Sequence, residues 1–285
     1  MEIGITNYYI DNYGLDEGAK KMAEHGYSFI DLQFTNTNTK YYTEREENFL
    51  SLVLGVKRTL RKHGISVNQI HGPCCTPRLD STEDERAELF GKMAKALVIA
   101  KHLDAKYMVV HPLMPYGVNS PVSPYEVYDI NKRYYTALAK VAHGLGVLVC
   151  LENVPFKNFP LASSENILKL ISDINHPFLK LCFDTGHAHI LGENLGDAAR
   201  NIGNEFLKAI HVHDNFGEKD CHLVPYEGNI DWADFAEGLY DIGFEGVFSL
   251  ETKPISSVEL NSGITTEQIE EKELELSKIA KLIAG

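Results

Sequence analysis

The stretch AIHVHDNFGEKDCHLVPYEGNIDW, residues 209–232, holds the densest group of chemically capable side chains in this chain. It places three histidines and two acids close together: His211, His213, Asp214, Asp220 and His222. Imidazole and carboxylate groups bind divalent cations and transfer protons near neutral pH. The group therefore indicates metal or proton chemistry, provided that the fold brings similar groups from elsewhere to it.

Other short apolar runs end in the same residue types. These ends are His71 in QIHGP, His111 in VVHPL, Glu152 in CLENV, Asp184 and His187 in CFDTGH, and Glu251 in SLETK. A buried carboxylate is unfavourable unless it is paired, hydrogen-bonded or bound to a cation. If the run ends meet, the carboxylates among them repel one another, and a divalent cation resolves that repulsion.

The runs themselves have the composition of buried strands, and stretches of helical period separate them. We expect strands near residues 2–6, 29–34, 67–71, 107–111, 147–152, 179–184, 209–213 and 247–251. Alternating strands and helices without a linker predict a single-domain (β/α)8 TIM barrel over residues 1–285. An open doubly wound sheet is less favoured, because the turn after the first strand, TNYYIDNYG, has no glycine-rich phosphate motif. In a barrel the carboxyl ends of all strands meet at one mouth, so the chemically capable residues would converge there.

Composition limits the possible partners. With 27 basic and 40 acidic residues the formal net charge is −13, which opposes binding to nucleic acid. No apolar run has the length of a membrane helix, and the N-terminal residues do not resemble a signal peptide, so we expect a cytoplasmic protein without a membrane partner. The five cysteines form no CxxC pair, which argues against a zinc ribbon.

The motifs LEN, FDTGH, HVHDN, DxH, GNIDW and SLET, in this order on successive run ends, resemble the xylose-isomerase-like superfamily of TIM barrels. This sugar isomerase and epimerase group also contains endonuclease IV. The resemblance covers essentially the whole chain. It implies one divalent cation held by Glu152, Asp184, His211 and Glu251, and this oxygen-rich set suits Mn²⁺, Mg²⁺ or Co²⁺.

The resemblance further implies an isomerase or epimerase acting on a sugar or sugar phosphate. The cation would polarise a substrate carbonyl, and Glu152 and Glu251 would act as acid and base on opposite faces of the substrate. We expect further substrate contacts from Lys253, Trp232 and Phe216 in the loops of the mouth. A small sugar is the expected partner, and a homo-oligomer is compatible with the resemblance.

Two other activities remain open. Endonuclease IV is a multi-zinc phosphodiesterase whose additional ligands match His71, His111, His187, Asp220 and His222, and Zn²⁺ would then replace the single cation. A metal-dependent dehydratase of keto-sugars or cyclitols would use the same site. Against the endonuclease stand the net charge, the scarcity of arginine in the mouth loops, where only Arg78 falls, and the loop GPCCTPRLD, which has no aromatic residue.

Overall fold

The computed structural model describes residues 1–73, 82–119, 123–255 and 263–285. The loop GPCCTPRLD from residue 74 onwards, including Arg78, lies outside these ranges. Eight parallel strands form the centre: β1 (Ile3–Ile5), β2 (Phe29–Gln33), β3 (Ser66–His71), β4 (Tyr107–Val110), β5 (Leu148–Glu152), β6 (Leu179–Asp184), β7 (Leu207–His211) and β8 (Phe248–Leu250). The predicted (β/α)8 barrel is confirmed.

The strands follow the order β7-β6-β5-β4-β3-β2-β1-β8, so β1 to β7 are neighbours in their sequence order and β8 pairs with β1. Between β8 and β7 the ring is completed by a parallel bridge from Val212 to Leu250. There the Val212 N–H donates to the Ser249 carbonyl at 2.9 Å, and the Glu251 N–H donates to the Val212 carbonyl at 2.9 Å. This bridge brings the residues after β7 and β8 side by side at the mouth.

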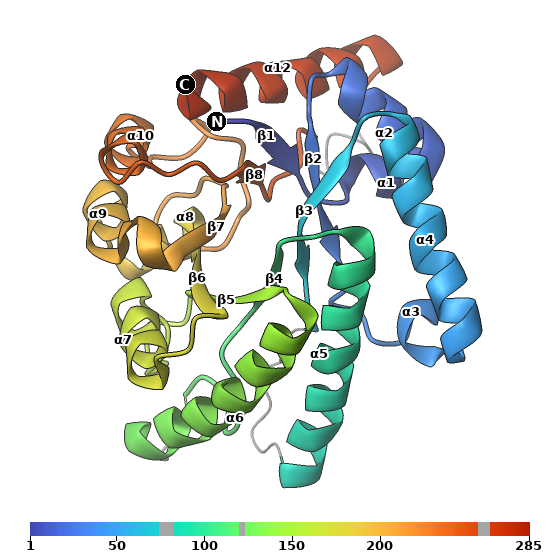
Figure 1. Ribbon diagram of the computed structural model, residues 1–285. Coiled ribbons are helices and arrows are strands. Elements are labelled where there is room, and N and C mark those ends of the chain that lie inside the picture. The colour runs from blue at the N-terminus through green and yellow to red at the C-terminus, as the bar shows by residue number, and fades with distance from the viewer. Residues whose placement is uncertain (74–81, 120–122, 256–262) are drawn as a thin grey trace.

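Helices surround the barrel (Figure 1). Their bounds are α1 (Tyr8–Tyr13), α2 (Leu15–Glu24), α3 (Lys40–Thr43), α4 (Glu46–Lys62), α5 (Glu83–Leu103), α6 (Pro124–Leu145), α7 (Ser164–Ile174), α8 (Thr185–Leu191), α9 (Leu195–Phe206), α10 (Trp232–Asp241) and α12 (Thr266–Ala284). The short helices α1, α3 and α8 were not predicted, because pieces of one or two turns carry too little periodicity. Among the described residues no helix is long and apolar enough to span a membrane.

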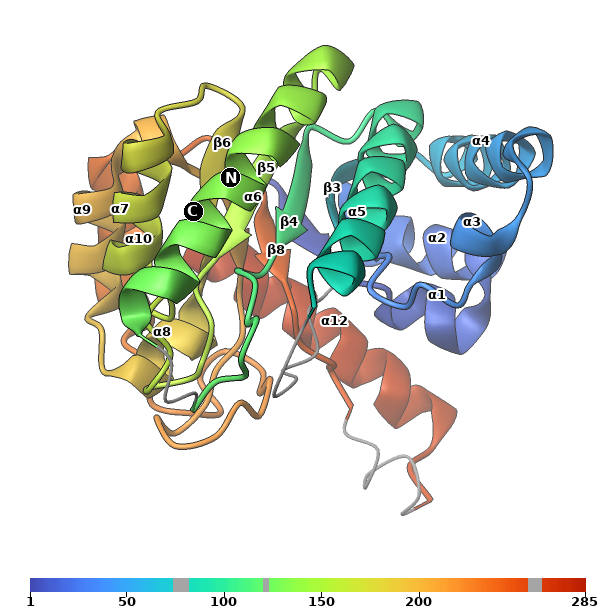
Figure 2. The same cartoon turned by 90° about the horizontal axis from the view of Figure 1, so that it is seen from below.

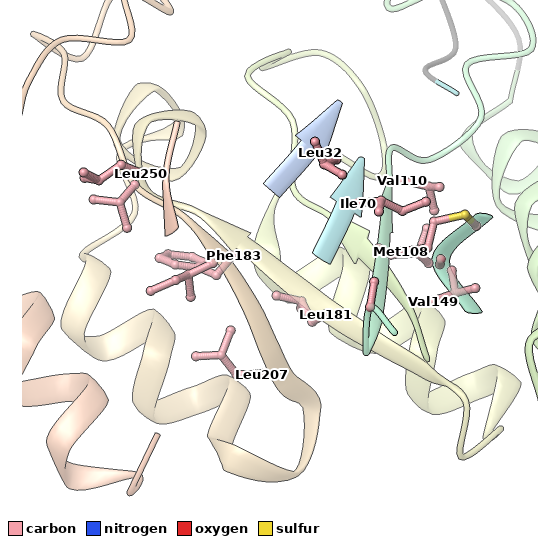
Figure 3. Close-up of a cluster of buried hydrophobic side chains, with 14 of the residues drawn as sticks. Leu32, Ile70, Met108, Val110, Val149, Leu181, Phe183, Leu207 and Leu250 are labelled. Carbon is pink, nitrogen blue, oxygen red and sulfur yellow. The ribbon is translucent and has the colours of Figure 1, made fainter. Parts of the chain in front are cut away.

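Each strand is buried on both faces. Its alternate residues point either outward to the helices or inward to the centre of the barrel. Side chains between the barrel and the helices form the large apolar core; Figure 3 labels Leu32, Ile70, Met108, Val110, Val149, Leu181, Phe183, Leu207 and Leu250 from this layer. A separate small cluster of Val109, Cys150, Cys182 and Ala209 comes from the opposite faces of β4–β7. Because the side-chain period of a strand is two, the next residues on that inner face are His111, Glu152, Asp184 and His211.

The loops that follow the carboxyl ends of the strands gather on one side of the molecule. In Figure 2 the orange loop after β7, the green loop after β4 and helix α8 lie on the same side. The two termini lie side by side (Figure 1): the amino group of Met1 donates to the Ala284 carbonyl at 2.9 Å. The candidate site is therefore built at the side where the strands end.

Candidate metal centre

Four side chains converge above the inner apolar layer. Nδ1 of His211, at the end of β7, lies 2.9 Å from Oε1 of Glu152 and 3.0 Å from Oε2 of Glu251. With Asp184 these residues offer four donor atoms that all lie within 4.8 Å of one another. Glu152, Asp184 and His211 are buried, and the Glu251 side chain is 19% exposed. The tertiary structure thus brings together the four residues that the family resemblance implies as ligands of one cation.

Charge attraction holds both glutamates of this group in their ionised form. Burial alone would raise the pKa of Glu251, but the His211 imidazole lowers it to about 2. Burial would likewise raise the pKa of Glu152, yet His211 and His111 hold it well below its usual range. Conversely, burial would lower the pKa of His211, but Glu251 and Glu152 raise it well above its ordinary value. Three carboxylates around one imidazole fit a hard divalent cation, which binds in place of the imidazole proton.

A second group shares Glu152. Its Oε2 atom lies 3.3 Å from Nε2 of His71 and 3.2 Å from Nε2 of His111. Nδ1 of His71 faces the Gly72 carbonyl at 3.0 Å, so Nδ1 carries a proton. In the neutral tautomer of His71, Nε2 then points a lone pair at a carboxylate. That contact is favourable only with a second proton or a metal ion between the two atoms.

The same argument applies on the other side of the mouth. Nδ1 of His187 donates to the Asn153 carbonyl at 2.8 Å, and Nδ1 of His222 donates to the Glu251 carbonyl at 2.7 Å. Their Nε2 atoms both face Oδ2 of Asp220, at 3.2 Å and 3.3 Å. Backbone carbonyls thus fix the tautomer of both rings and turn the remaining nitrogens toward one carboxylate, which is an arrangement typical of metal-binding histidines.

His213 lies between the first group and Asp220. Its Nε2 atom is 3.1 Å from Asp184 and 3.7 Å from Asp220, while its buried Nδ1 has no hydrogen-bond partner among the described residues. Together with Asp220 and His222 it forms a further set of donors within reach of one ion. His71, His111, His187, Asp220 and His222, all singled out from the sequence, therefore lie in metal-sized groups around the central four.

One residue in contact with the central group was not identified from the sequence. Asp31 lies fully buried in β2, and its Oδ2 atom accepts from Nε2 of His211 at 2.8 Å and from Nε2 of Gln69 at 3.0 Å. This contact turns Nδ1 of His211 toward Glu152 and Glu251. The signal was present in the sequence: the run FIDLQF carries an acid in the middle of an apolar strand, on the inward-facing parity.

The expected contact of Trp232 with substrate does not hold in this structure. Its ring is 1% exposed, and its Nε1 donates to Oδ2 of Asp214 at 3.0 Å. Asp214 also accepts from the backbone N–H groups of Asn215, Tyr226 and Ile230, at 2.8, 2.9 and 3.2 Å. Trp232 and Asp214 therefore shape the loop after β7 and do not face a ligand.

A cavity of about 700 Å³ opens beside the central group. It is lined by Thr6, Asn7, Tyr8, Asp11, Asn12, Gln33, Cys221, His222, Leu223, Glu227, Glu251, Thr252, Lys253, Pro254 and Ile255. Lys253, an expected substrate contact, is part of this lining. Phe216 is 60% exposed and is not part of this lining. The cavity reaches from Glu251 and His222 to the polar residues of the segments after β1 and at the end of β2.

Comparison with known proteins agrees with this geometry. The family model described as "Xylose isomerase-like TIM barrel" matches residues 19–278. An uncharacterised protein of Methanocaldococcus jannaschii is 28% identical over 98% of this chain and 94% of its own length. A D-psicose 3-epimerase of Ruminiclostridium cellulolyticum is 24% identical over 81% of this chain and 76% of its own length.

The similarity extends to the other branch of the superfamily. A probable endonuclease 4 of Mycoplasmopsis synoviae is 29% identical over 56% of this chain and 62% of its own length. Among solved structures, a D-psicose 3-epimerase crystallised in the presence of D-fructose superposes with a TM-score of 0.79 at 20% identity, covering 100% of both chains. The fold, the donors at the strand ends and the match over most of the sequence lead to one conclusion: this chain belongs to the xylose isomerase-like TIM barrel family.

Proposed function

We propose that the protein is a divalent-metal-dependent isomerase or epimerase of sugars. One observation carries the proposal: a single imidazole nitrogen of His211 lies about equally close to two glutamates, 2.9 Å from Glu152 and 3.0 Å from Glu251, and Glu251 lines a cavity. The similarity to a D-psicose 3-epimerase over most of the chain supports the same kind of activity. The donor set of Glu152, Asp184, His211 and Glu251 fits Mn²⁺, Mg²⁺ or Co²⁺.

The residues of the chain account for the proton movements that such a reaction needs. A bound divalent cation would supply polarisation of a carbonyl, which acidifies the neighbouring C–H bond. Both glutamates are carboxylates at neutral pH, so each can accept that proton. Glu251 lines the cavity and removes the proton from one face of the substrate. Glu152, after taking up a proton from water, gives it to the other face or to the adjacent carbon, and Glu251 passes the abstracted proton to water.

The test is solvent exchange. The protein is reconstituted with Mn²⁺ and incubated with neutral and phosphorylated ketoses in deuterated water, and deuterium incorporation next to the carbonyl is followed by NMR. Glu152→Gln and Glu251→Gln should each reduce exchange by at least about 100-fold, because each removes a catalytic base. Glu245→Gln, at an exposed position remote from these donors, is the matched control and should keep full exchange. Undiminished exchange in either glutamine variant of the site would refute the base assignment.

A second candidate is a multi-zinc phosphodiesterase. The observation that favours it is that the central group is flanked by three further metal-sized groups: His71, His111 and Glu152; Asp184, His187 and His213; and His213, Asp220 and His222. Metal content per chain separates the two activities. One equivalent after reconstitution supports the isomerase or epimerase. Two or three equivalents of zinc, together with cleavage of a duplex that contains an abasic site, would support the phosphodiesterase.

A further inference from the structure

A separate group of metal-type donors lies outside the barrel mouth, where the C-terminal helix α12 packs against α1 and α2 (Figure 1). It consists of His25, immediately after α2, and of Glu270 and Glu273 on α12. Their donor atoms all lie within 4.8 Å of one another, and the group shares no residue with the groups of the mouth. His25 and Glu273 are buried, whereas the Glu270 side chain is 41% exposed, so an ion can enter past Glu270.

The Glu273 carboxylate is only half satisfied. Its Oε1 atom accepts from the Tyr13 hydroxyl at 2.7 Å, but its buried Oε2 atom has no hydrogen-bond partner among the described residues. Oε2 points into the group, because it lies 3.8 Å from Nδ1 of His25. A buried carboxylate oxygen without a hydrogen-bond donor is unfavourable unless a cation binds it.

The charges around Glu273 leave room for such a cation. Lys21 donates to Oε2 of Glu270 at 2.6 Å, so two carboxylates meet one ammonium in this group. The neighbouring phenols add no positive charge. Burial raises the pKa of Tyr8 and Tyr13, and Glu273 raises it further, so both remain neutral donors.

The His25 ring can present a nitrogen to an ion. Its Nδ1 faces the Tyr9 hydroxyl at 2.7 Å, and its Nε2 faces Oε1 of Glu270 at 2.7 Å. A hydroxyl accepts as well as donates, so Nδ1 can donate to Tyr9 while Nε2 offers its lone pair. That lone pair and the Glu270 carboxylate are then compatible only with a second proton or a metal ion between them. An outer partner on the far nitrogen is typical of metal-binding histidines.

We propose that His25, Glu270 and Glu273 bind a Zn²⁺ ion that fastens the C-terminal helix α12 to α2. Zn²⁺ takes imidazole nitrogen and carboxylate oxygen as ligands, and water completes its tetrahedral coordination. The ion supplies the partner that Oε2 of Glu273 lacks and offsets the excess negative charge of the group. This site is structural and does not depend on the chemistry proposed for the barrel mouth.

The first test counts zinc per chain by elemental analysis after equilibration at the same free Zn²⁺ concentration. We expect the wild type to hold one equivalent more than Glu273→Gln. Glu275→Gln changes an exposed acid on the same helix and should keep the wild-type count. Glu270→Gln, at a partly exposed position, should also lose the equivalent and covers the case in which Glu273→Gln does not fold. Since Glu273→Gln leaves the mouth intact, its count is the one that separates the two activities proposed above.

Melting temperatures distinguish a metal ligand from a packing residue. With a chelator, Glu273→Gln should melt at the wild-type temperature or above it, because the amide leaves no uncompensated charge buried. At free Zn²⁺ about 100-fold above its Kd, the wild type should gain roughly 5 °C or more beyond the gain of the variant. In wild-type protein labelled with ¹⁵N-histidine, the ring nitrogens of His25 should shift on addition of Zn²⁺. The signals that disappear in His25→Gln identify them.

Equal zinc counts in the wild type and in both glutamine variants of the group would overturn the inference. His25 signals that do not respond to Zn²⁺ would overturn it too, since a proton on His25 would then balance the charge. A loss of stability in Glu273→Gln that is the same with chelator and with Zn²⁺ would show that the carboxylate serves packing alone.

Discussion

The histidines of the barrel mouth differ in which of their nitrogens is already engaged. His71, His187 and His222 each donate from Nδ1 to a backbone carbonyl and turn Nε2 toward a carboxylate. His211 does the opposite: its Nε2 faces Asp31, and its Nδ1 faces the two glutamates. The partner on the far nitrogen fixes which nitrogen can bind a cation, so these outer contacts define the site as much as the donors do.

The first prediction concerns Asp31, which acts through His211. Asp31→Asn replaces a charged acceptor with a neutral amide and weakens the hold on Nε2 of His211. We expect the affinity for Mn²⁺ to fall about 10- to 100-fold, which is the usual effect of losing such an outer partner. Competition with a chelating dye measures this affinity. Asp234→Asn, a change to an acid at the start of α10, is the control, and an unchanged affinity in Asp31→Asn would show that Asp31 does not position His211.

At the scale of elements, the short helix α8 places the DTGH residues. Asp184 ends β6 and also caps α8, because its Oδ1 accepts from the His187 backbone N–H at 2.7 Å. Asp184 therefore contributes a possible metal-ligand oxygen to the central group and also directs the chain into the turn that carries His187. The loop after β7 is organised in a similar way by Asp214, which holds Tyr226 at a φ of 75° through the Tyr226 N–H.

The second prediction tests the packing of α8. A Cβ at Gly186 would lie 1.9 Å from Cε1 of His213, a distance that no side chain tolerates. Gly186→Ala must therefore displace His213 from Asp184, and we expect a lower melting temperature and loss of any ion that His213 helps to hold. Gly91→Ala is the matched control: its Cβ meets no atom within 4 Å in the middle of α5. That change should stabilise the protein by about 0.5–1 kcal/mol, because alanine is the better helix former. Equal melting temperatures of the two variants would contradict the packing argument.

At the scale of the whole molecule, the stability of the metal-free protein should depend on protons held at the mouth. Burial alone would lower the pKa of His187, but Asp184 and Asp220 raise it to about 10 from an ordinary value of 6.5. A histidine whose pKa is higher in the folded than in the unfolded state binds its proton more tightly when the protein is folded. It therefore stabilises the folded state fully at pH values below its pKa in the unfolded chain. This contribution is complete below pH 6.5 and disappears as the pH rises through about 10.

The third prediction follows from this sign. In the presence of a chelator, the melting temperature should fall between pH 7 and pH 10, and His187→Gln should reduce that fall, because the variant has no such proton to lose. Differential scanning calorimetry of both proteins across this range measures the difference. A wild-type melting temperature that rises with pH, or an identical slope in the variant, would exclude His187 as a source of the dependence. Metal uptake should release protons in the same range, since the ion replaces them.

Features that depend on interactions between residues close in sequence could be predicted, and features that depend on contacts between distant segments could not. The eight strands and the ends that carry Glu152, Asp184, His211 and Glu251 could be predicted, because an apolar run that ends in a polar residue is a local signal, and a barrel sends all such ends to one mouth. The division of each strand into residues that face the helices and residues that face the barrel interior can also be predicted, because successive side chains point to opposite faces of a strand.

What the sequence by itself determined is therefore the barrel, its family and the residue types gathered at its mouth. Only the tertiary structure decided which atoms face one another. Asp31 contacts His211 across 180 positions of sequence, Trp232 is buried because Asp214 folds the loop around it, and the buried Nε2 atom of Gln33 has no hydrogen-bond partner among the described residues. These outcomes depend on contacts between segments far apart in the chain, and side-chain burial and hydrogen-bond partners are fixed only when such segments pack together.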